Sequence, residues 1–405
     1  MSINEVKEPV RGSILGIEEI EAVARVLNES HALSRGPEIE KFERAFAEHL
    51  GVKYCVAVSS CTVALRLAFQ SLNLKKGDHV IVPVNAFWNA VCYLIEKEVS
   101  ISVVDLEKFS LTIDTNLISE KISKKTKAIL SYSHGGNPSN MSALRKICNS
   151  FGITLIEDCA HGNGSLWKDK SLAHWSDISC FSFSTLKNMS TLGEGGMVAT
   201  NSKKTYQNIL LLRSGYPIGK TVKAKRGSID NEMDKFLKPG DFYKNKWTEV
   251  ESIGSKYVMT TPQAAVGLVQ LKKLASFNLM RQQIASRYID ALKNIEEIKF
   301  WDIDQNSKCA WHLFHFFINS NTNEIRDAVV RDLRINSRIE VVNRFWPLSM
   351  NSVFVYKKFN DSCPNYENQV KNSIFSLPIS PNLGDEEVNY ILAKVTRSLK
   401  THLIK

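Results

Sequence analysis

Seven short apolar runs alternate with helical or loop segments between residues 54 and 201, and this alternation constrains the fold more than any other feature. The runs span residues 54–58, 79–84, 101–106, 127–132, 153–158, 178–184 and 196–201. Near-continuous apolar strands interleaved with helices are typical of a largely parallel sheet covered on both faces. We therefore predict an α/β domain whose sheet has seven, mostly parallel strands.

A helical segment precedes this domain. Residues 17–29 and 38–51 carry apolar side chains at helical spacing, and Gly51 is suited to end the second helix. We expect an N-terminal helical segment over residues 1–50 and the large α/β domain over residues 51–279.

The second half of the chain has a different pattern. Residues 216–254 are charged and weakly periodic, and we expect a long loop excursion there. A long helix follows, with Thr261 as its expected cap and Pro262 in its first turn. It leads into a smaller α+β domain, residues 280–405, with a strand-like stretch at 311–319 and a closing helix.

The composition is that of a globular protein, with 43% hydrophobic and 23% charged residues. No apolar stretch reaches the roughly 18 residues that a bilayer-spanning helix needs, and the first residues lack the apolar region of a secretory signal, so we expect a cytoplasmic protein. The eight cysteines stand singly with no CxxC pair, which indicates reduced thiols rather than a metal site or a disulfide framework.

The formal net charge is +10, and basic residues gather only at residues 220–227. This cluster is either a solvated loop or a contact to an anionic substrate. We do not expect a nucleic-acid partner, because no zinc finger, RNP-like run or helix-turn-helix accompanies the charge.

Ligands of parallel sheets bind at the carboxyl ends of the strands, so the residues after each run are candidates for a site. After the first run, "SSCTVAL" leads from Ser60 directly into a helix. The backbone amides of Cys61 and Thr62, with the Thr62 hydroxyl, would face an anion at the helix N-terminus. The alternative is an ordinary helix cap.

Three other strand ends carry side chains suited to a planar, cationic ring. Phe87 or Trp88 could stack on such a ring, or could belong to the core. Asp158 closes an apolar run, where a carboxylate is costly unless it meets a cation; otherwise it is a capping or loop aspartate. Lys187 is the single charge in a long uncharged run. A desolvated amine is nucleophilic and can form a Schiff base with an aldehyde, and the alternative is a buried ion pair.

Together these groups specify one molecule, pyridoxal 5'-phosphate. Lys187 would hold its aldehyde, Asp158 its ring nitrogen and Phe87 its π-face, and the hydroxyls of Thr62 and Ser182 would hold its phosphate. A protonated ring nitrogen lets the ring accept electrons from the substrate, and a released lysine can move the substrate's proton.

Ten stretches of the chain also carry a family resemblance. They are "LSRGPEIEKFERAFAEHLG", "SSCTVAL", "GDHVIVPVNAFWNA", "KISKKTKAIL", "GGNPSNM", "LIEDCAHGNG", "CFSFSTLKNMSTLGEGGMVATN", "QAAVGLVQLKKL", "WHLF" and "FSLPISPNLGDEEV". Over nearly its full length the sequence resembles the DegT-type sugar aminotransferases, fold-type I enzymes that use pyridoxal phosphate.

The resemblance assigns roles to single positions. It implies that Lys187 is the Schiff-base lysine, that Asp158 faces the pyridine nitrogen, and that His161 lies near the phenolic oxygen of the cofactor. It also implies that Phe87 stacks on the ring and that the phosphate-binding hydroxyls are those of Thr62 and Ser182.

The resemblance also implies the reaction and the assembly. Such enzymes are homodimers with active sites at the subunit interface, and they pass an amino group from L-glutamate to a keto-sugar carried on a nucleotide. A subset with histidine at the lysine position performs dehydration, and the lysine retained here favours transamination.

Several positions depart from the family pattern. Cys61 replaces a glycine of the phosphate turn, and Lys256 replaces an asparagine that reaches the partner's phosphate. Ser133, beside His134, and Ser349 stand where the family commonly has histidine. These positions frame the substrate, so the acceptor can be unusual.

A glutamate α-carboxylate needs a cation, ideally an arginine fork. Arg213, Arg338 and Arg344 are the candidates. Two other functions stay open, namely the same chemistry on a cyclitol, ketose phosphate or octulosonic acid, and a cofactor-binding sensor without turnover.

Overall fold

The computed structural model describes residues 5–7, 11–29, 32–214, 254–319, 323–343, 346–352 and 361–403. The loop excursion predicted for residues 216–254, with its basic cluster, lies outside the described residues except for Gly254. Arg344 also lies outside them.

The predicted seven-stranded sheet is confirmed. Its spatial order is β1-β9-β8-β5-β4-β2-β3. The strands are β1 (Tyr54–Val58), β2 (His79–Pro83), β3 (Ser100–Val104), β4 (Thr126–Tyr132), β5 (Thr154–Cys159), β8 (Ile178–Ser182) and β9 (Gly196–Thr200). Only β9 runs opposite to its neighbours, so the sheet is mostly parallel as predicted.

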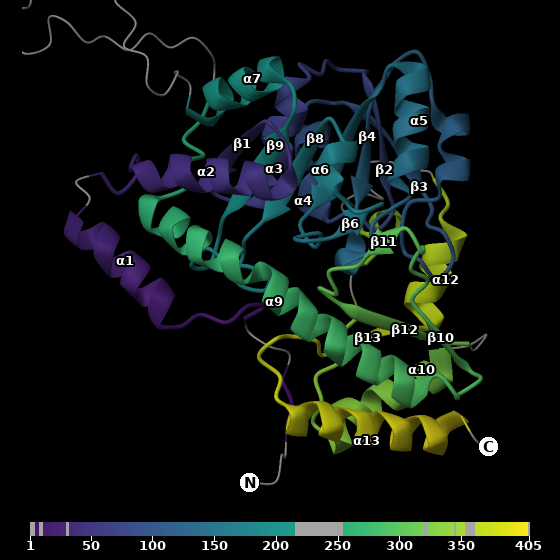
Figure 1. The fold of residues 1–405 in the computed structure, drawn as a ribbon. Coiled ribbons are helices and arrows are strands. Elements are labelled where there is room, and N and C mark those ends of the chain that lie inside the picture. The colour runs from purple at the N-terminus through teal and green to yellow at the C-terminus, as the bar shows by residue number, and fades with distance from the viewer. Residues whose placement is uncertain are drawn as a thin grey trace, which may run out of the picture.

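Helices cover both faces of this sheet (Figure 1). They include α3 (Cys61–Ser71), α4 (Trp88–Glu96), α5 (Met141–Phe151), α6 (Leu172–Trp175) and α7 (Lys203–Ser214). Alternate residues of a strand enter different cores: Val80 and Val82 of β2 lie in one cluster, and Ile81 lies in the other. This division explains why the strands are apolar at nearly every position.

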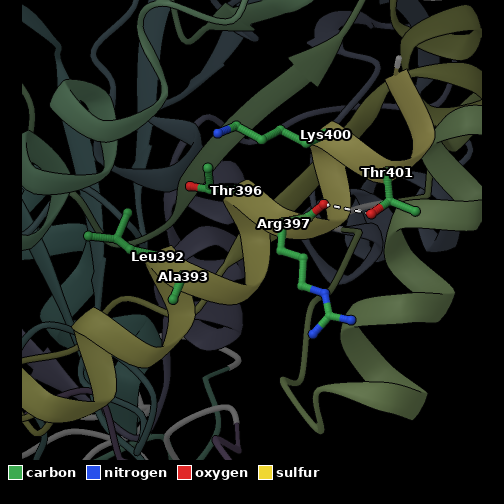
Figure 2. A pocket seen from close by; sticks show the side chains of 6 residues that line it. All are labelled: Leu392, Ala393, Thr396, Arg397, Lys400 and Thr401. Carbon is green, nitrogen blue, oxygen red and sulfur yellow. Dashed lines mark hydrogen bonds between the residues drawn. The ribbon is translucent and has the colours of Figure 1, made fainter. Parts of the chain in front are cut away.

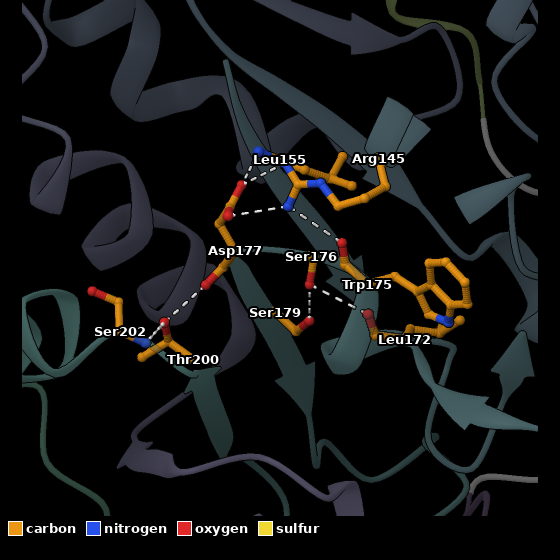
Figure 3. Close-up of polar contacts among 9 residues, drawn as sticks. All are labelled: Arg145, Leu155, Leu172, Trp175, Ser176, Asp177, Ser179, Thr200 and Ser202. Carbon is orange, nitrogen blue, oxygen red and sulfur yellow. Dashed lines mark hydrogen bonds and ion pairs between the residues drawn. The ribbon is translucent and has the colours of Figure 1, made fainter. Parts of the chain in front are cut away.

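Asp177, directly before β8, ties three strands together at the amino-terminal end of β5 and β8 (Figure 3). Its carboxylate accepts from the Leu155 backbone N–H at 2.8 Å and pairs with Arg145 at 3.0 Å. The Thr200 hydroxyl donates to its carbonyl oxygen at 2.8 Å. The candidate site lies at the opposite end, the carboxyl end, of β5 and β8.

The N-terminal helices are confirmed as α1 (Ile17–Glu29) and α2 (Pro37–Leu50). Gly51 ends α2 with φ at +67°, and its N–H bonds the carbonyls of Ala47 and Glu48. Both helices contact the long helix α9 (Thr261–Leu292).

The predicted cap of α9 is wrong by one residue. The cap is Thr260, whose N–H donates to Gln263 Oε1 at 2.9 Å in a capping box. Thr261 is instead the first helical residue, and its hydroxyl bridges the N-terminal segment by accepting from Gly36 N and donating to Ala32 O. Because Thr260 and Thr261 are adjacent threonines before a proline, the local sequence does not indicate which of them caps the helix.

A smaller antiparallel sheet lies along α9 in the C-terminal part (Figure 1). Its order is β10 (Ile298–Phe300), β12 (Phe314–Ile318), β13 (Ile374–Leu377), and β12 confirms the strand predicted within 311–319. The helices here are α10 (Asn323–Arg331), a π-helix (Asp332–Asn336), α12 (Pro364–Asn372) and the predicted closing helix α13 (Asp385–Leu403). The domain boundaries stay a prediction, since the one at residues 279/280 falls inside α9.

The remaining elements are short. They are β6 (Leu166–Trp167), β7 (Lys170–Ser171), β11 (Ser307–Lys308) and the 3-10 turns Thr115–Leu117, Ser119–Lys121, His134–Gly136 and Leu348–Met350. All eight cysteines are free thiols. Within the described ranges, no helix combines the length and the apolar character needed to cross a membrane.

Candidate active site

The turn from β1 into α3 is built for close backbone approach. Ser60 caps α3 and accepts from the Val63 N–H at 3.3 Å. Gly196, the first residue of β9, packs on this turn so closely that a Cβ there would lie 2.5 Å from the Ser60 carbonyl carbon and 2.8 Å from the Cys61 nitrogen. The amides at the start of α3 are therefore held at the carboxyl end of the sheet, where an anion can bind.

Cys61, the departure from the family's glycine, is accommodated without strain. It is the first residue of α3 and is not among the residues with positive φ, so this backbone does not require glycine. Its Sγ lies 3.7 Å from Asp158 Oδ1. Thr62 next to it is exposed, which leaves its hydroxyl accessible.

Asp158 is buried near the end of β5, with 1% of its surface exposed. Burial raises the pKa of its carboxyl group to about 6, and the Ala160 N–H, Lys187 and Cys61 act in the opposite direction. The Ala160 N–H donates to Oδ1 at 2.9 Å. At neutral pH this is a carboxylate with too few donors for its burial, and a cationic ring nitrogen would stabilise it.

Lys187 lies half-buried in the turn after β8. Burial raises the pKa of Asp158 and of the Cys61 thiol, and the charge of Lys187 opposes this rise at both groups, so its ammonium group lies within electrostatic range of both. The fold thus brings together the amine and the carboxylate that the sequence separates by 29 positions. This is the pair on which the predicted cofactor site depends.

His161 follows β5 and is buried. Its Nδ1 accepts from the Gly135 N–H at 3.0 Å and lies 2.8 Å from the Tyr132 hydroxyl. Phe87 follows β2 at the same edge of the sheet, half-buried, with its ring 5.2 Å from that of Trp88.

The other predicted cofactor residues lie close to the same edge. Ser182 ends β8, is buried, and pairs in register with Gly196. Lys256 is exposed on a segment whose next residue, Tyr257, accepts from the Ser59 N–H at 3.0 Å beside the phosphate turn.

The structure gives the candidate arginines other surroundings. Arg213 is buried, pairs with Glu43 at 2.7 Å, and donates to Ala57 O at 2.9 Å. Arg338 is exposed and has φ of +50°. The contacts given for Arg213 and Arg338 do not include Lys187. That Arg213, Arg338 or Arg344 binds the α-carboxylate of glutamate therefore stays a prediction.

Sequence reasoning missed three buried residues around Lys187. Asn188 bonds His312 from the C-terminal part of the chain, at 3.0 Å. Arg281 of α9 donates to the carbonyl oxygens of Gly12 at 2.6 Å and Ile379 at 2.9 Å. The "WHLF" stretch could have indicated His312, whereas an arginine in a long helix gives no signal.

The residues present fit pyridoxal phosphate. A buried carboxylate lies within electrostatic range of an amine, the N-terminus of α3 lies beside the carboxylate, and only glycine fits where β9 meets the turn before α3. A hollow on α13, lined by Leu392, Ala393, Thr396, Arg397, Lys400 and Thr401, contains none of the predicted site residues (Figure 2).

Comparison with known proteins agrees with a site for pyridoxal phosphate. The profile of the DegT/DnrJ/EryC1/StrS aminotransferase family matches residues 14–396. The chain belongs to this family. It is an aminotransferase, and pyridoxal phosphate is its cofactor.

Individual relatives cover nearly all of the aminotransferase. The spore coat polysaccharide biosynthesis protein SpsC of Bacillus subtilis is 30% identical, with 96% of each chain covered. GDP-perosamine synthase of Escherichia coli O157:H7 is 31% identical over 96% of this chain and 97% of that one. The solved structure of E. coli GDP-4-keto-6-deoxy-D-mannose-3-dehydratase with bound hydrated pyridoxal phosphate is 25% identical, with a TM-score of 0.82 over 96% of this chain and 100% of that one.

Proposed function

We propose that this aminotransferase moves the amino group of L-glutamate to a nucleotide-linked keto-sugar in the biosynthesis of an amino sugar. The observation that carries the proposal is the lysine–carboxylate pair: the buried Asp158 lies 3.7 Å from Cys61 at the start of α3, and the charge of Lys187 acts on it against the rise in pKa that burial causes. The names of two relatives, a polysaccharide biosynthesis protein and a GDP-perosamine synthase, support the substrate class.

The proposed steps follow from the residues. Pyridoxal phosphate supplies an aldehyde and an electron-accepting ring. Asp158, ionised at neutral pH, would keep a positive charge on the ring nitrogen, and Lys187 would hold the cofactor and move the proton at the substrate Cα. The backbone amides at the start of α3, with Thr62 and Ser182, would hold the phosphate.

We also propose a homodimer with its active sites at the interface. Apolar side chains next to the site are exposed: Leu186 and Leu192 flank Lys187 in the same turn region, with 37% and 45% of their surfaces exposed, and Trp88 beside Phe87 has 48% exposed. A neighbouring subunit would cover them. The mass of the protein in solution, compared with 45.7 kDa for one chain, tests this.

A half-reaction tests the main proposal. The holoenzyme mixed with L-glutamate should lose the visible absorption of the lysine-bound cofactor and release one 2-oxoglutarate per site. The aminated cofactor form is then offered a panel of nucleotide-linked keto-sugars, cyclitols, ketose phosphates and octulosonic acids, and recovery of the absorption identifies the acceptor class. Lys187→Ala is the control and should lack the absorption band of the lysine-bound cofactor. No spectral change with glutamate or any other amino donor would contradict the proposal and favour a sensor.

A further inference from the structure

The side-chain amide of Asn188, directly after Lys187, has one possible orientation. Asn188 is 1% exposed. Its Nδ2 donates to the backbone carbonyl of Ala310 and to Asn278 Oδ1, both at 2.8 Å. A carbonyl oxygen only accepts, so the atom facing Ala310 must be the amide nitrogen.

A second asparagine fixes the same orientation from the other side. Asn278 Nδ2 donates to the backbone carbonyl of Asn163 at 2.9 Å, which turns Asn278 Oδ1 toward Asn188. Gly164, with φ of +86°, makes room for this contact, because a Cβ there would lie 2.2 Å from Asn278 Nδ2. Two backbone carbonyls therefore orient Asn188 so that its Oδ1 faces His312.

This orientation determines the tautomer of His312. The distance from Asn188 Oδ1 to His312 Nδ1 is 3.0 Å, and Oδ1 can only accept. His312 must then carry its proton on Nδ1. In the neutral ring, Nε2 has the lone pair.

His312 in turn packs on His161. The two ring centroids are 4.0 Å apart with their planes at 39°, and both side chains are buried. His161 has the opposite tautomer, because the Gly135 N–H donates to its Nδ1 and leaves the proton for Nε2. Among the described residues, the titratable groups that contact His161 besides His312 include Tyr132, whose hydroxyl lies 2.8 Å from Nδ1 and 3.4 Å from Nε2, and His134, with its ring 5.8 Å away.

We propose that Asn188 is a positioning residue: it holds His312 as the Nδ1–H tautomer against His161, and so keeps the Nε2–H of His161 directed at the phenolic oxygen of the cofactor. The contact between His161 and the cofactor rests on the proposed function, whereas the tautomer of His312 does not. The array links the lysine turn, through His312 of the C-terminal part, to His161 after β5.

The tautomer is tested by ¹⁵N NMR of the histidine-labelled full-length protein, before and after addition of pyridoxal phosphate. The chain has 9 histidines, and His312→Phe assigns the resonance of interest. The wild type should show the Nδ1–H pattern for His312 in both states, and Asn188→Ala should shift it toward the Nε2–H form. Asn137→Ala is the matched control, since Asn137 is equally buried but donates to the carbonyls of Ser110 and Asp302. A wild-type His312 with its proton on Nε2 would overturn the proposal, as would a tautomer unchanged in Asn188→Ala.

The link to the cofactor is tested by the pH titration of its visible band. A donor to the phenolic oxygen makes that oxygen a weaker acceptor for the proton it shares with the lysine nitrogen. Asn188→Ala should therefore raise the titration midpoint by roughly half to one pH unit, the effect of weakening one hydrogen bond. Asn137→Ala should leave it in place. If Asn188→Ala keeps the visible band of the cofactor and its titration midpoint does not shift, the link between Asn188 and the cofactor is overturned. If the protein takes up no pyridoxal phosphate, the proposed function and the link fail together, and the NMR result still decides the tautomer.

Discussion

At Asp158, burial and the surrounding donors act in opposite directions on the pKa of the carboxyl group. Burial alone disfavours the charge, and the Ala160 N–H, Lys187 and Cys61 restore part of it, which leaves the pKa at about 6. A carboxylate balanced in this way responds strongly to one further positive charge. The ring nitrogen of the cofactor would supply that charge.

Replacement of this carboxylate tests its role. Asp158→Asn should retain the cofactor but lose at least about a hundredfold in kcat, the size of removing one electrostatic partner from a buried reacting group. The measurement is the cofactor content and the steady-state rate. Asp177→Asn, at the opposite end of the strands, serves as the control and should lower stability while the rate per folded molecule is kept. Near-normal turnover in Asp158→Asn would mean that this residue does not protonate the ring nitrogen.

Some residues of the site could be predicted from the sequence alone, and others could not. Lys187 and Asp158 are predictable because a lone charge next to an apolar run is costly and needs a reason. The pairing of Asn188 with His312 is not predictable, because 124 positions separate the two residues and only the fold makes them neighbours.

At the scale of elements, the strands were predictable and one helix start was not. Both faces of the sheet are covered, so the strands are apolar at nearly every position and can be recognised without knowledge of their neighbours. The cap of α9 depends instead on where the hydroxyl of Thr261 finds its partner, the distant Ala32 carbonyl. That information is not contained in the local sequence.

The contact between β9 and the phosphate turn gives a prediction at this scale. Gly196→Ala would place a Cβ 2.5 Å from the Ser60 backbone, which has no side-chain freedom to move aside. We expect a loss of about 1–3 kcal/mol in the free energy of unfolding and a weaker affinity for pyridoxal phosphate, because the turn must shift. Denaturant unfolding and cofactor titration measure both. Gly16→Ala is the matched control, since its nearest neighbour would be a side-chain atom 3.9 Å away. Equal affinities in the two variants would contradict a role for this contact in phosphate binding.

For the whole molecule, Arg281 joins parts of the chain that are distant in sequence. From α9 it donates to Gly12 in the N-terminal segment and to Ile379 in the C-terminal part, and burial lowers its pKa to about 9. Gly12 in turn lies against the lysine turn, where a Cβ would meet the Leu186 carbonyl oxygen at 1.9 Å. The position of Lys187 therefore depends on both ends of the chain, which no local pattern could reveal.

A second buried carboxylate makes the stability of the whole molecule depend on pH. Glu157 is fully buried beside Asp158; Ser133 donates to its Oε1, and its Oε2 has no partner among the residues that the structure describes. Burial raises its pKa to about 7, against the effect of Ser133 and Ser131. Because the folded-state pKa lies above the unfolded value of about 4.5, the folded protein binds more protons between these two pH values, and its stability falls as the pH rises through this window.

Glu157→Gln isolates this contribution, since glutamine keeps the acceptor for Ser133 and cannot ionise. Relative to the wild type, the free energy of unfolding of Glu157→Gln should increase from pH 5 to pH 8 by about 2–3 kcal/mol. Urea unfolding of the two proteins across this range measures the difference, with the exposed Glu120→Gln as the control, for which no such trend is expected. Parallel stability curves for wild type and Glu157→Gln would show that Glu157 is already ionised at pH 5 in the folded protein, so that an unseen donor stabilises its second oxygen.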